Sequence, residues 1–370
     1  MVQLIDLSEG WRMFRRSLRI KSKGYGRYPG NAPQILGHIV NQCWNAKQHY
    51  YQVSNGNYPE FYCRDFGICT DALLALGHRD KIVKTLEYAM AIYSKHGKIT
   101  QVISPKGIPF EFPYYSSDAL PFILRSLNAA KAKDLIAMYK EFLNYEIGRY
   151  YELVFDEKTG LAKKESKIAG MRDHAMRISP CYHNCMIAML KNEIQKAGLN
   201  NPFKKFDFKK IIKEMFWKDG YFIDDLSGNH FVTGDANVFP FWCNIFEDRK
   251  MMQSMMKKIR ENGLDYPFPL RYYHAKGRHQ KMIWQEIFVG DWENDTAWLH
   301  LGLCFLDVVK KADPQMYDFY LHKYAGLVEH YGNLMEVFTE KARPFETMFY
   351  SADEGMLWSS KLLAHLQGKV

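Results

Sequence analysis

Apolar residues recur at spacings of three and four along almost the whole chain, and this periodicity restricts the fold more than any other feature. Such spacing places apolar side chains on one face of an α-helix. Several of the stretches contain an internal Gly or Lys-Asp break and are interpreted as helix pairs, which predicts roughly ten to twelve helices. The stretches are residues 31–48, 64–97, 116–155, 180–198, 208–217, 241–262, 295–313, 314–332 and 353–368.

The alternation that is typical of a β-strand occurs only in the short sequence YFIDD at 221–225. No Pro/Gly/Ser-rich linker divides the 370 residues, and a hydrophobic fraction of 47% is enough for a sizeable core. We therefore predict an all-α chain that forms a single domain over residues 1–370. An α-solenoid would require self-similar repeats, and these stretches do not align on one another. Their long, individually distinctive loops favour a closed double ring of helices, with the loops gathered over one mouth.

The net charge of +9 is spread along the chain and forms no basic stripe. The densest cluster of lysines, at 203–220, also contains acids and is typical of the solvated face of an amphipathic helix. We therefore predict no nucleic-acid partner. No stretch approaches about 18 apolar residues and the N-terminus does not resemble a signal peptide, so we expect no membrane span and a cytoplasmic location. The sequence carries no indication of the oligomeric state.

The seven cysteines form no CxxC pair, and their odd number argues against a full disulfide framework. Cys181 and Cys185 flank His183 at a spacing that places two ligands on one helix face. A second pair of ligands elsewhere in the chain is missing. We therefore predict neither a metal site nor a cofactor.

Acidic residues recur where aromatic loops lead into helices. One such residue is readily explained as a helix cap, whereas five in one chain predict a shared pocket lined by rings and carboxylates. A sugar needs this combination, because carboxylates and Arg bind its hydroxyls and aromatic faces cover its C–H patches. The substrate-binding candidates from these loops are Arg64, Asp65, Tyr114, Tyr115, Asp118, Trp292, Asn294, Asp295 and Trp358, and two further loops contain Asp173 and Glu336.

Three of these stretches resemble, in this order, loop motifs of the six-hairpin (α/α)6-barrel glycosidases. The family includes the glucoamylases, the trehalases, the amylo-1,6-glucosidases and glycoside hydrolase family 63. The stretches are FYCRDFGICTDALLALG (61–77), SKIAGMRDHAMR (166–177) and LMEVFTEKARPFETMFYSADEGMLWSSKLL (334–363). The resemblance extends from about residue 40 to the end and implies an (α/α)6 barrel.

Carried over by position, the resemblance implies that Arg64 and Asp65 bind the outer hydroxyls of the terminal sugar. It implies that Asp173 is the general acid and that Glu336 is the general base of an inverting reaction. Such enzymes hold the two carboxyl groups roughly 6.5–9.5 Å apart, with room for a water. Because a nearby guanidinium favours the ionised carboxylate, Arg172 is expected to point away from Asp173. If it does not, Asp118 or Glu152 is the alternative acid.

The sequence therefore predicts an inverting, exo-acting glycoside hydrolase of the α-glucosidase type, with a short saccharide or glucoside as substrate. Two alternatives stay open. One is a sugar epimerase, or an unsaturated-uronide hydrolase or lyase, on the same fold. The epimerases pair two histidines, and the candidates here are His174, His183, His274 and His279. The other is a non-catalytic carbohydrate-binding toroid, in which Asp173 and Glu336 would not share a cleft.

Overall fold

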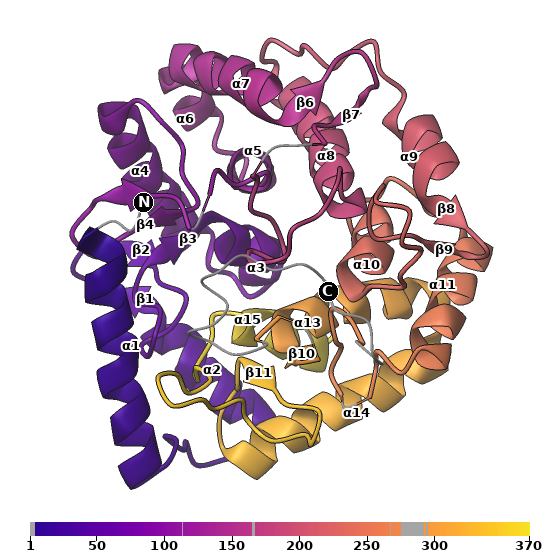
Figure 1. The fold of residues 1–370 in the computed structure, drawn as a ribbon. Coiled ribbons are helices and arrows are strands. Elements are labelled where there is room, and N and C mark those ends of the chain that lie inside the picture. The colour runs from indigo at the N-terminus through magenta and orange to yellow at the C-terminus, as the bar shows by residue number, and fades with distance from the viewer. Residues whose placement is uncertain (1–3, 113, 165–166, 267, 275–291, 294) are drawn as a thin grey trace.

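Two concentric rings of helices make up the fold (Figure 1). The computed structural model describes the chain except for residues 1–3, 113, 165–166, 267, 275–291 and 294. The inner ring contains α3 (Cys63–Ala75), α5 (Ala119–Ala129), α8 (Cys181–Ala197), α10 (Gly234–Trp242), α13 (Leu299–Ala312) and α15 (Ser359–Leu366). The outer ring contains α2 (Ala32–Gln42), α4 (Arg79–His96), α7 (Lys140–Val154), α9 (Phe208–Phe216), α11 (Arg249–Glu261) and α14 (Pro314–Tyr331). The short α6 (Lys133–Met138) precedes α7, and α1 (Leu4–Lys23) lies outside both rings.

Contacts between neighbouring inner helices close the ring. Helix α3 packs on α5, α5 on α8, α8 on α10, α10 on α13 and α15 on α3. Between α13 and α15, Asp307 accepts a hydrogen bond from Lys361 Nζ at 2.6 Å and lies 2.8 Å from Nε2 of His365. The predicted all-α double ring, an (α/α)6 barrel, is confirmed.

Outer and inner helices differ in how their surfaces are buried. In α9 the buried residues Phe208, Ile212 and Phe216 recur every four positions, and the lysines between them face solvent. In α10 all nine residues are buried, including an internal proline, Pro240. A helix that is covered on all sides has no apolar stripe, which explains why the sequence periodicity did not reveal α10. Helix α1 was also missed, because it joins the rest of the chain partly through the buried polar residues Arg16 and Ser17.

The long loops all lie on one side of the ring. Connections from an inner to the next outer helix are short, such as 76–78 after α3 and the single residue 313 after α13. Connections from an outer to the next inner helix are long, such as 155–180 before α8 and 332–358 before α15. Each inner helix therefore starts beneath a long loop, and the start of the inner helices marks the mouth of the barrel.

Short antiparallel strand pairs tie these loops together. The pairs are β1 (Trp44–Asn45) with β2 (Tyr50–Tyr51), β3 (Phe61–Tyr62) with β4 (Val102–Ile103), β4 with β5 (Pro109–Phe110), β6 (Phe155–Asp156) with β7 (Leu161–Ala162), β8 (Trp217–Lys218) with β9 (Tyr221–Phe222), and β10 (Ala297–Trp298) with β11 (Val337–Phe338). Strand β9 falls within the predicted YFIDD. The β10–β11 pair places Trp298 opposite Val337, and so brings the residue after Glu336 to the start of α13.

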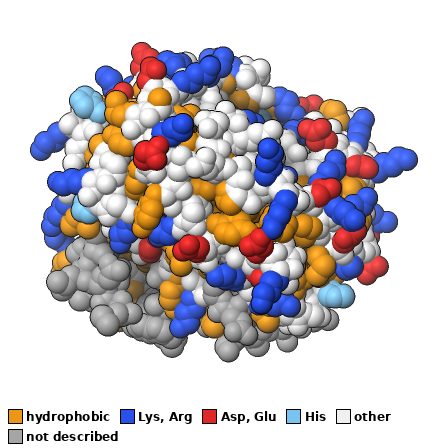
Figure 2. Space-filling view, turned by 90° about the horizontal axis from the view of Figure 1, so that it is seen from above, with side chains coloured by type: hydrophobic (Ala, Val, Ile, Leu, Met, Phe, Trp, Pro, Cys, Tyr) orange, Lys and Arg blue, Asp and Glu red, His pale blue; other side chains and the backbone are white. Residues whose placement is uncertain are grey.

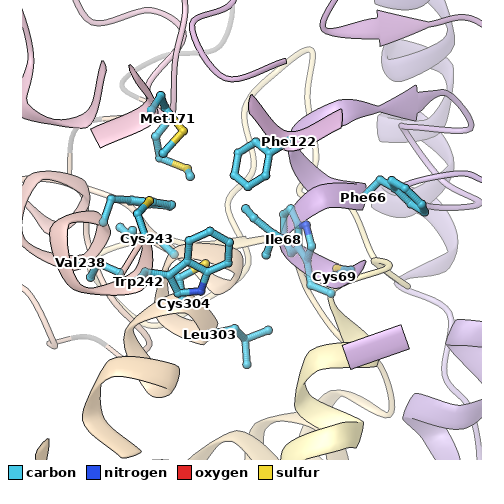
Figure 3. Packing of buried hydrophobic residues seen from close by; sticks show 14 of the residues in the cluster. Phe66, Ile68, Cys69, Phe122, Met171, Val238, Trp242, Cys243, Leu303 and Cys304 are labelled. Carbon is cyan, nitrogen blue, oxygen red and sulfur yellow. The ribbon is translucent and has the colours of Figure 1, made fainter. Parts of the chain in front are cut away.

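Apolar and sulfur-containing side chains from different inner helices fill the centre of the ring (Figure 3). Ile68 and Cys69 come from α3, Phe122 from α5, and Trp242 from the end of α10, and all four are buried. Met171, from the loop before α8, lies at the upper edge of this group in Figure 3. This packed core forms the floor on which the mouth of the barrel rests.

The outer surface carries charges of both signs. On the face drawn in Figure 2, Lys and Arg side chains are interspersed with Asp and Glu. Among the helices that the structure describes, none is long and apolar enough to cross a membrane.

Gly67 marks a close approach of α3 to α5. A Cβ atom at this position would lie 2.6 Å from Cβ and 2.7 Å from Cγ of Phe122, closer than Cβ atoms approach non-bonded atoms in proteins. We expect Gly67→Ala to lower the free energy of unfolding by about 1–3 kcal/mol, because the buried ring has no room to move. Urea or thermal unfolding measures this change.

Gly37→Ala in α2 is the matched control, since a Cβ atom there meets nothing within 4 Å. The better helix propensity of alanine should leave this variant unchanged or stabilise it by up to about 1 kcal/mol. Equal stability of the two variants would contradict the tight α3–α5 packing.

Candidate active site

A cavity lies at the mouth of the barrel, over the starts of α3, α13 and α15. Its empty space, open mouth included, is about 550 Å³. Among the described residues, its lining includes four carboxylates and three tryptophans. They are Asp65, Asp173, Glu293, Glu336, Trp292, Trp298 and Trp358.

Arg64, in the first turn of α3, connects three parts of the mouth. Its Nε donates to Asp118 at 2.7 Å, and its Nη1 and Nη2 donate to the two oxygens of Asp173 at 3.1 and 2.9 Å. Nη2 also donates to the carbonyl of Gly170. Burial acts to lower the pKa of Arg64, but the facing carboxylates of Asp118 and Asp173 outweigh it and raise the pKa. The charged guanidinium therefore fixes the Asp173 side chain on both oxygens.

Asp118 supports Arg64 from behind and does not line the cavity. It stands at the N-cap of α5 but makes no capping hydrogen bond. Instead, its carboxylate accepts hydrogen bonds from Arg64, Ser116 and Tyr182, the last at 2.7 Å. Asp118 is therefore placed to hold the arginine and not to contact a ligand.

The backbone that carries Asp173 is held by Glu293. The amides of Asp173 and His174 donate to the two oxygens of this carboxylate at 2.7 and 2.9 Å. Glu293 is buried and lies one residue after Trp292. The sequence reasoning placed Trp292 in the site but not Glu293, although the same loop contains both.

Arg172 points away from Asp173, as predicted. Its Nη2 donates to Asp224 at 2.5 Å, and its Nε lies 3.5 Å from Asp235. Arg177 contacts the same two carboxylates, at 3.3 and 2.7 Å. This buried network of two arginines and two aspartates anchors the loop of Asp173 to the residues around β9 and α10.

Glu336 is buried at the start of β11, and one of its oxygens is held by the protein. Its Oε2 accepts hydrogen bonds from the amide of Asp353 at 2.7 Å and from the hydroxyl of Tyr350. The hydroxyl of Tyr58 also forms a hydrogen bond with this carboxyl group, and Glu336 lines the cavity. Burial, followed by the charge of Asp353, raises the pKa of Glu336 to about 8.

A buried cation supports the loop that holds Glu336. Arg16 of α1 donates to the carbonyls of Ser351 and Ala352, both at 3.2 Å, and its Nη2 lies 3.2 Å from Asp353 Oδ1. Helix α1 thus anchors the 351–354 loop from outside the rings. Arg16, which makes these contacts, is also one of the buried polar residues that kept α1 from being recognised by its apolar periodicity.

Asp65 follows Arg64 in α3 and points toward α15. Its Oδ1 accepts a hydrogen bond from the indole of Trp358 at 2.7 Å. Burial raises the pKa of Asp65 to about 6, against the opposing effects of Arg64 and Trp358. This carboxylate therefore lines the cavity with its charge only partly compensated.

A continuous wall of rings lines one side of the cavity. Ring centroids lie 4.9 Å apart for Trp292 and Trp298, 5.2 Å for Trp298 and His300, and 4.6 Å for His300 and Trp358. Such a wall offers apolar faces to the C–H groups of a sugar ring.

Several predicted residues lie elsewhere. Lys167 sits 5.7 Å over the ring of Tyr114, and Arg149 sits 4.9 Å over Tyr115, and neither tyrosine lines the cavity. Asp295 lies 3.2 Å from Arg271 and 3.0 Å from His274, also outside the lining. Asn294 and His279 lie outside the described residues. Glu152, the alternative acid, is exposed on the outer helix α7.

The sequence reasoning also missed His300, Tyr58 and Tyr350. His300 lies inside the apolar stretch of α13 and looks like a core residue, so no sequence signal pointed to it. Tyr350 lies within the 334–363 stretch that carries the resemblance, but it was not among the candidate residues. Among the described residues, no group of three His, Cys, Asp or Glu side chains is placed to hold a metal ion.

No protein-family model and no curated protein matches this chain. Solved structures do match it. A glycosidase variant in complex with glucose superposes with a TM-score of 0.60 at 13% identity, over 92% of this chain and 97% of its own. A GH63 mannosylglycerate hydrolase from Thermus thermophilus in complex with glucose gives a TM-score of 0.58 at 11% identity, over 91% of this chain and 100% of its own.

A rhamnosidase from Klebsiella oxytoca with rhamnose bound gives a TM-score of 0.65 at 10% identity, over 93% of this chain and 66% of its own. At such low identities the likeness establishes the fold. The chain has the (α/α)6-barrel fold of the six-hairpin glycosidases.

The raised pKa of Glu336 predicts a pH-dependent effect of Glu336→Gln on stability. A carboxyl group with a pKa near 4.5 in the unfolded chain and about 8 in the folded chain binds its proton more tightly when folded. Its stabilising contribution is complete below about pH 4.5 and is lost as the pH rises to about 8. Glutamine has no such proton. The variant should therefore gain stability relative to wild type as pH rises, by up to about 1.4 kcal/mol per pH unit.

Urea unfolding at several pH values across this window measures the difference in the free energy of unfolding. Glu340→Gln, which removes an exposed carboxylate from the same loop, is the control for loss of one charge. A difference between Glu336→Gln and wild type that is constant with pH would contradict the raised pKa.

Proposed function

We propose that the chain is a glycoside hydrolase that removes the terminal sugar from a short saccharide or glucoside, with Asp173 as general acid and Glu336 as general base. One observation carries the proposal: two carboxylates far apart in the sequence line one cavity together with a wall of aromatic rings. The fold supports it, since structures of similar fold hold glucose or rhamnose.

The cavity has the groups that a hexose ring requires. Asp65 and the guanidinium of Arg64 lie side by side at its edge and suit the outer hydroxyls of a terminal sugar. The Trp298 and Trp358 rings line the same cavity and offer apolar faces to the C–H groups of that sugar ring. Both groups come from the starts of inner helices or the strands beside them, which gives the site a rigid base.

Glu336 has the geometry of a general base for an attacking water. Tyr350 and the Asp353 amide hold Oε2, and the carboxyl group lines the cavity. A carboxylate held on one oxygen can orient a water with the other. In an inverting reaction this water attacks the sugar on the face opposite to the leaving oxygen.

Asp173 requires a change before it can donate a proton. Both of its oxygens accept hydrogen bonds from Arg64. A bound sugar whose hydroxyls engage Arg64 would loosen this pair and free one carboxyl oxygen for the glycosidic oxygen. The pKa of Glu336, about 8, favours the opposite assignment in the empty cavity, with Glu336 as acid and Asp173 as base.

The geometry favours the hydrolase over the alternatives on this fold. Asp173 and Glu336 share one cavity, which is not expected of a non-catalytic toroid. Of the four histidines considered for an epimerase, the three that the structure describes do not line the cavity. His300 is the histidine in the described lining, so a pair of histidines does not face the ligand space.

Two variants and two leaving groups separate the catalytic roles. A fluoride leaves without protonation, so an enzyme without its acid still hydrolyses a glycosyl fluoride. We expect Asp173→Asn to lose about 100-fold or more in kcat on an alkyl glucoside while keeping most of its activity on glucosyl fluoride. Glu336→Gln should lose activity on both substrates. Steady-state kinetics with both anomers of each substrate measures these changes.

The exposed Glu152→Gln is the control and should behave as wild type. The reverse pattern, with Glu336→Gln active on the fluoride, would exchange the two roles. Wild-type rates on the alkyl glucoside in both site variants would refute the hydrolase proposal.

The pH profile of kcat/KM gives an independent test of the base. This ratio reports ionisations of the free enzyme. If Glu336 is the base, kcat/KM should rise with pH up to about 8, since the ionised form is required. The hydroxyl of Tyr350 stabilises that form, so Tyr350→Phe should raise the pKa of Glu336 and shift the rising limb to higher pH. A limb that falls through the same pH range would identify Glu336 as the acid.

A further inference from the structure

Two buried polar atoms in the cavity wall have no hydrogen-bond partner in the described part of the chain. They are Nδ1 of His300 and Nε1 of Trp292. The other two tryptophans of the wall differ: Trp298 Nε1 donates to Thr296 Oγ1 at 2.9 Å and Trp358 Nε1 donates to Asp65 at 2.7 Å. A buried polar group without a partner costs about 1–3 kcal/mol, and native proteins contain few of them. Both atoms are therefore placed for a partner that the described part of the chain does not supply.

The tautomer of His300 follows from its neighbour Tyr272. The single hydroxyl hydrogen of Tyr272 is donated to the carbonyl of Met171 at 2.9 Å. The same hydroxyl oxygen lies 2.7 Å from Nε2 of His300, so Nε2 must carry the hydrogen and donate. Burial, helped by the charge of Arg64, holds the pKa of His300 well below its usual value, so the ring is neutral. Nδ1 is therefore a hydrogen-bond acceptor with an open lone pair.

The positions of both atoms are fixed by packing. The His300 ring lies between the rings of Trp298 and Trp358, and its Nε2 is held by Tyr272. The Trp292 ring packs against Trp298 and, at a centroid distance of 5.6 Å, against Tyr350. Both residues line the cavity, and packing thus holds one acceptor and one donor in fixed places.

We propose that His300 Nδ1 accepts a hydrogen bond from one hydroxyl of the bound sugar and that Trp292 Nε1 donates to a sugar oxygen. This inference rests on the proposed sugar substrate and adds the residues that select it. The ligand class is a neutral pyranose, because the open acceptor requires a hydroxyl donor and the surrounding carboxylates disfavour an anionic group. A site built to bind one hydroxyl discriminates strongly against analogues that lack it.

Tyr272 acts through His300 as a positioning residue. Its hydroxyl oxygen is the acceptor that keeps the hydrogen on Nε2 and the lone pair on Nδ1. In Tyr272→Phe this acceptor is absent, and the hydrogen is free to move to Nδ1. We expect this variant to lose the same sugar contact as a change of His300 itself, without any change in the ring wall.

The experiment combines substrate deoxygenation with substitution of His300. His300→Gln places an amide nitrogen near Nε2 and no acceptor near Nδ1, whereas His300→Asn places an amide oxygen near Nδ1. Binding of D-glucose, L-rhamnose and the monodeoxy forms of the sugar that binds is measured by tryptophan fluorescence and calorimetry. In wild type, removal of one hydroxyl should weaken binding about 10- to 100-fold.

In His300→Gln, removal of that hydroxyl should no longer weaken binding, while removal of the other hydroxyls should weaken it as in wild type. In His300→Asn, part of the loss of affinity on removal of that hydroxyl should return. Penalties that are the same in wild type and His300→Gln would overturn the inference, as would absence of binding by both sugars. Binding does not depend on hydrolysis. A His300-dependent penalty in a protein that cleaves no glycoside would therefore support this inference and refute only the proposed function.

A measurement on the unchanged protein covers the case in which the variants do not fold. Long-range ¹⁵N–¹H NMR correlations of labelled wild type distinguish a nitrogen that carries hydrogen from one that carries a lone pair. We expect Nε2 of His300 to be protonated without ligand, and the Nδ1 resonance to shift upfield when the sugar binds. A protonated Nδ1, or no shift on saturation, would contradict the proposal.

Discussion

The mouth of this barrel depends on one buried guanidinium. Arg64 binds Asp118 at the start of α5 and both oxygens of Asp173, and through Gly170 it also holds the backbone of the loop before α8. A buried charge of this kind is tolerated only when paired and hydrogen-bonded. Removal of Arg64 would leave Asp118 and Asp173 without the cation that they share. The same contacts that make α3, α5 and this loop one unit therefore also place Asp173 at the ligand space.

The charges around the cavity are arranged in two layers. Behind the wall, Arg172 and Arg177 pair with Asp224 and Asp235, and Arg16 pairs with Asp353. At the wall itself, Asp65 and Glu336 have no ion pair among the described residues, and burial raises the pKa of both, to about 6 and about 8. The pairs behind the wall thus hold loops, while Asp65 and Glu336 line the cavity with raised pKa values, as is common for groups that exchange protons.

The sequence predicted the double ring because outer helices such as α9 expose one face and keep a clear apolar period. It also identified the loops at the mouth, since acids beside aromatic residues recur where these loops lead into helices. It did not determine which side chains point inward. Tyr115 is held outside the cavity by Arg149 of α7, and Asp295 is engaged by Arg271, contacts between distant segments that local patterns do not record. The role of His300 could not be predicted for the opposite reason. It is a buried polar residue within an apolar helix, and its sequence surroundings are those of a core residue.

The topology explains why the candidate functional residues lie at one end of the barrel. Each outer helix is followed by an inner helix that runs back through the ring, so the inner helices start at the same mouth, beneath the long loops. A helix start has unpaired N–H groups and a partial positive charge, both of which favour carboxylates nearby. Asp65 in α3 and Asp235 in α10 occupy such first turns. The parallel inner helices therefore collect acidic residues over a packed apolar floor, and lengthening a loop at this mouth changes the ligand space without disturbing the core.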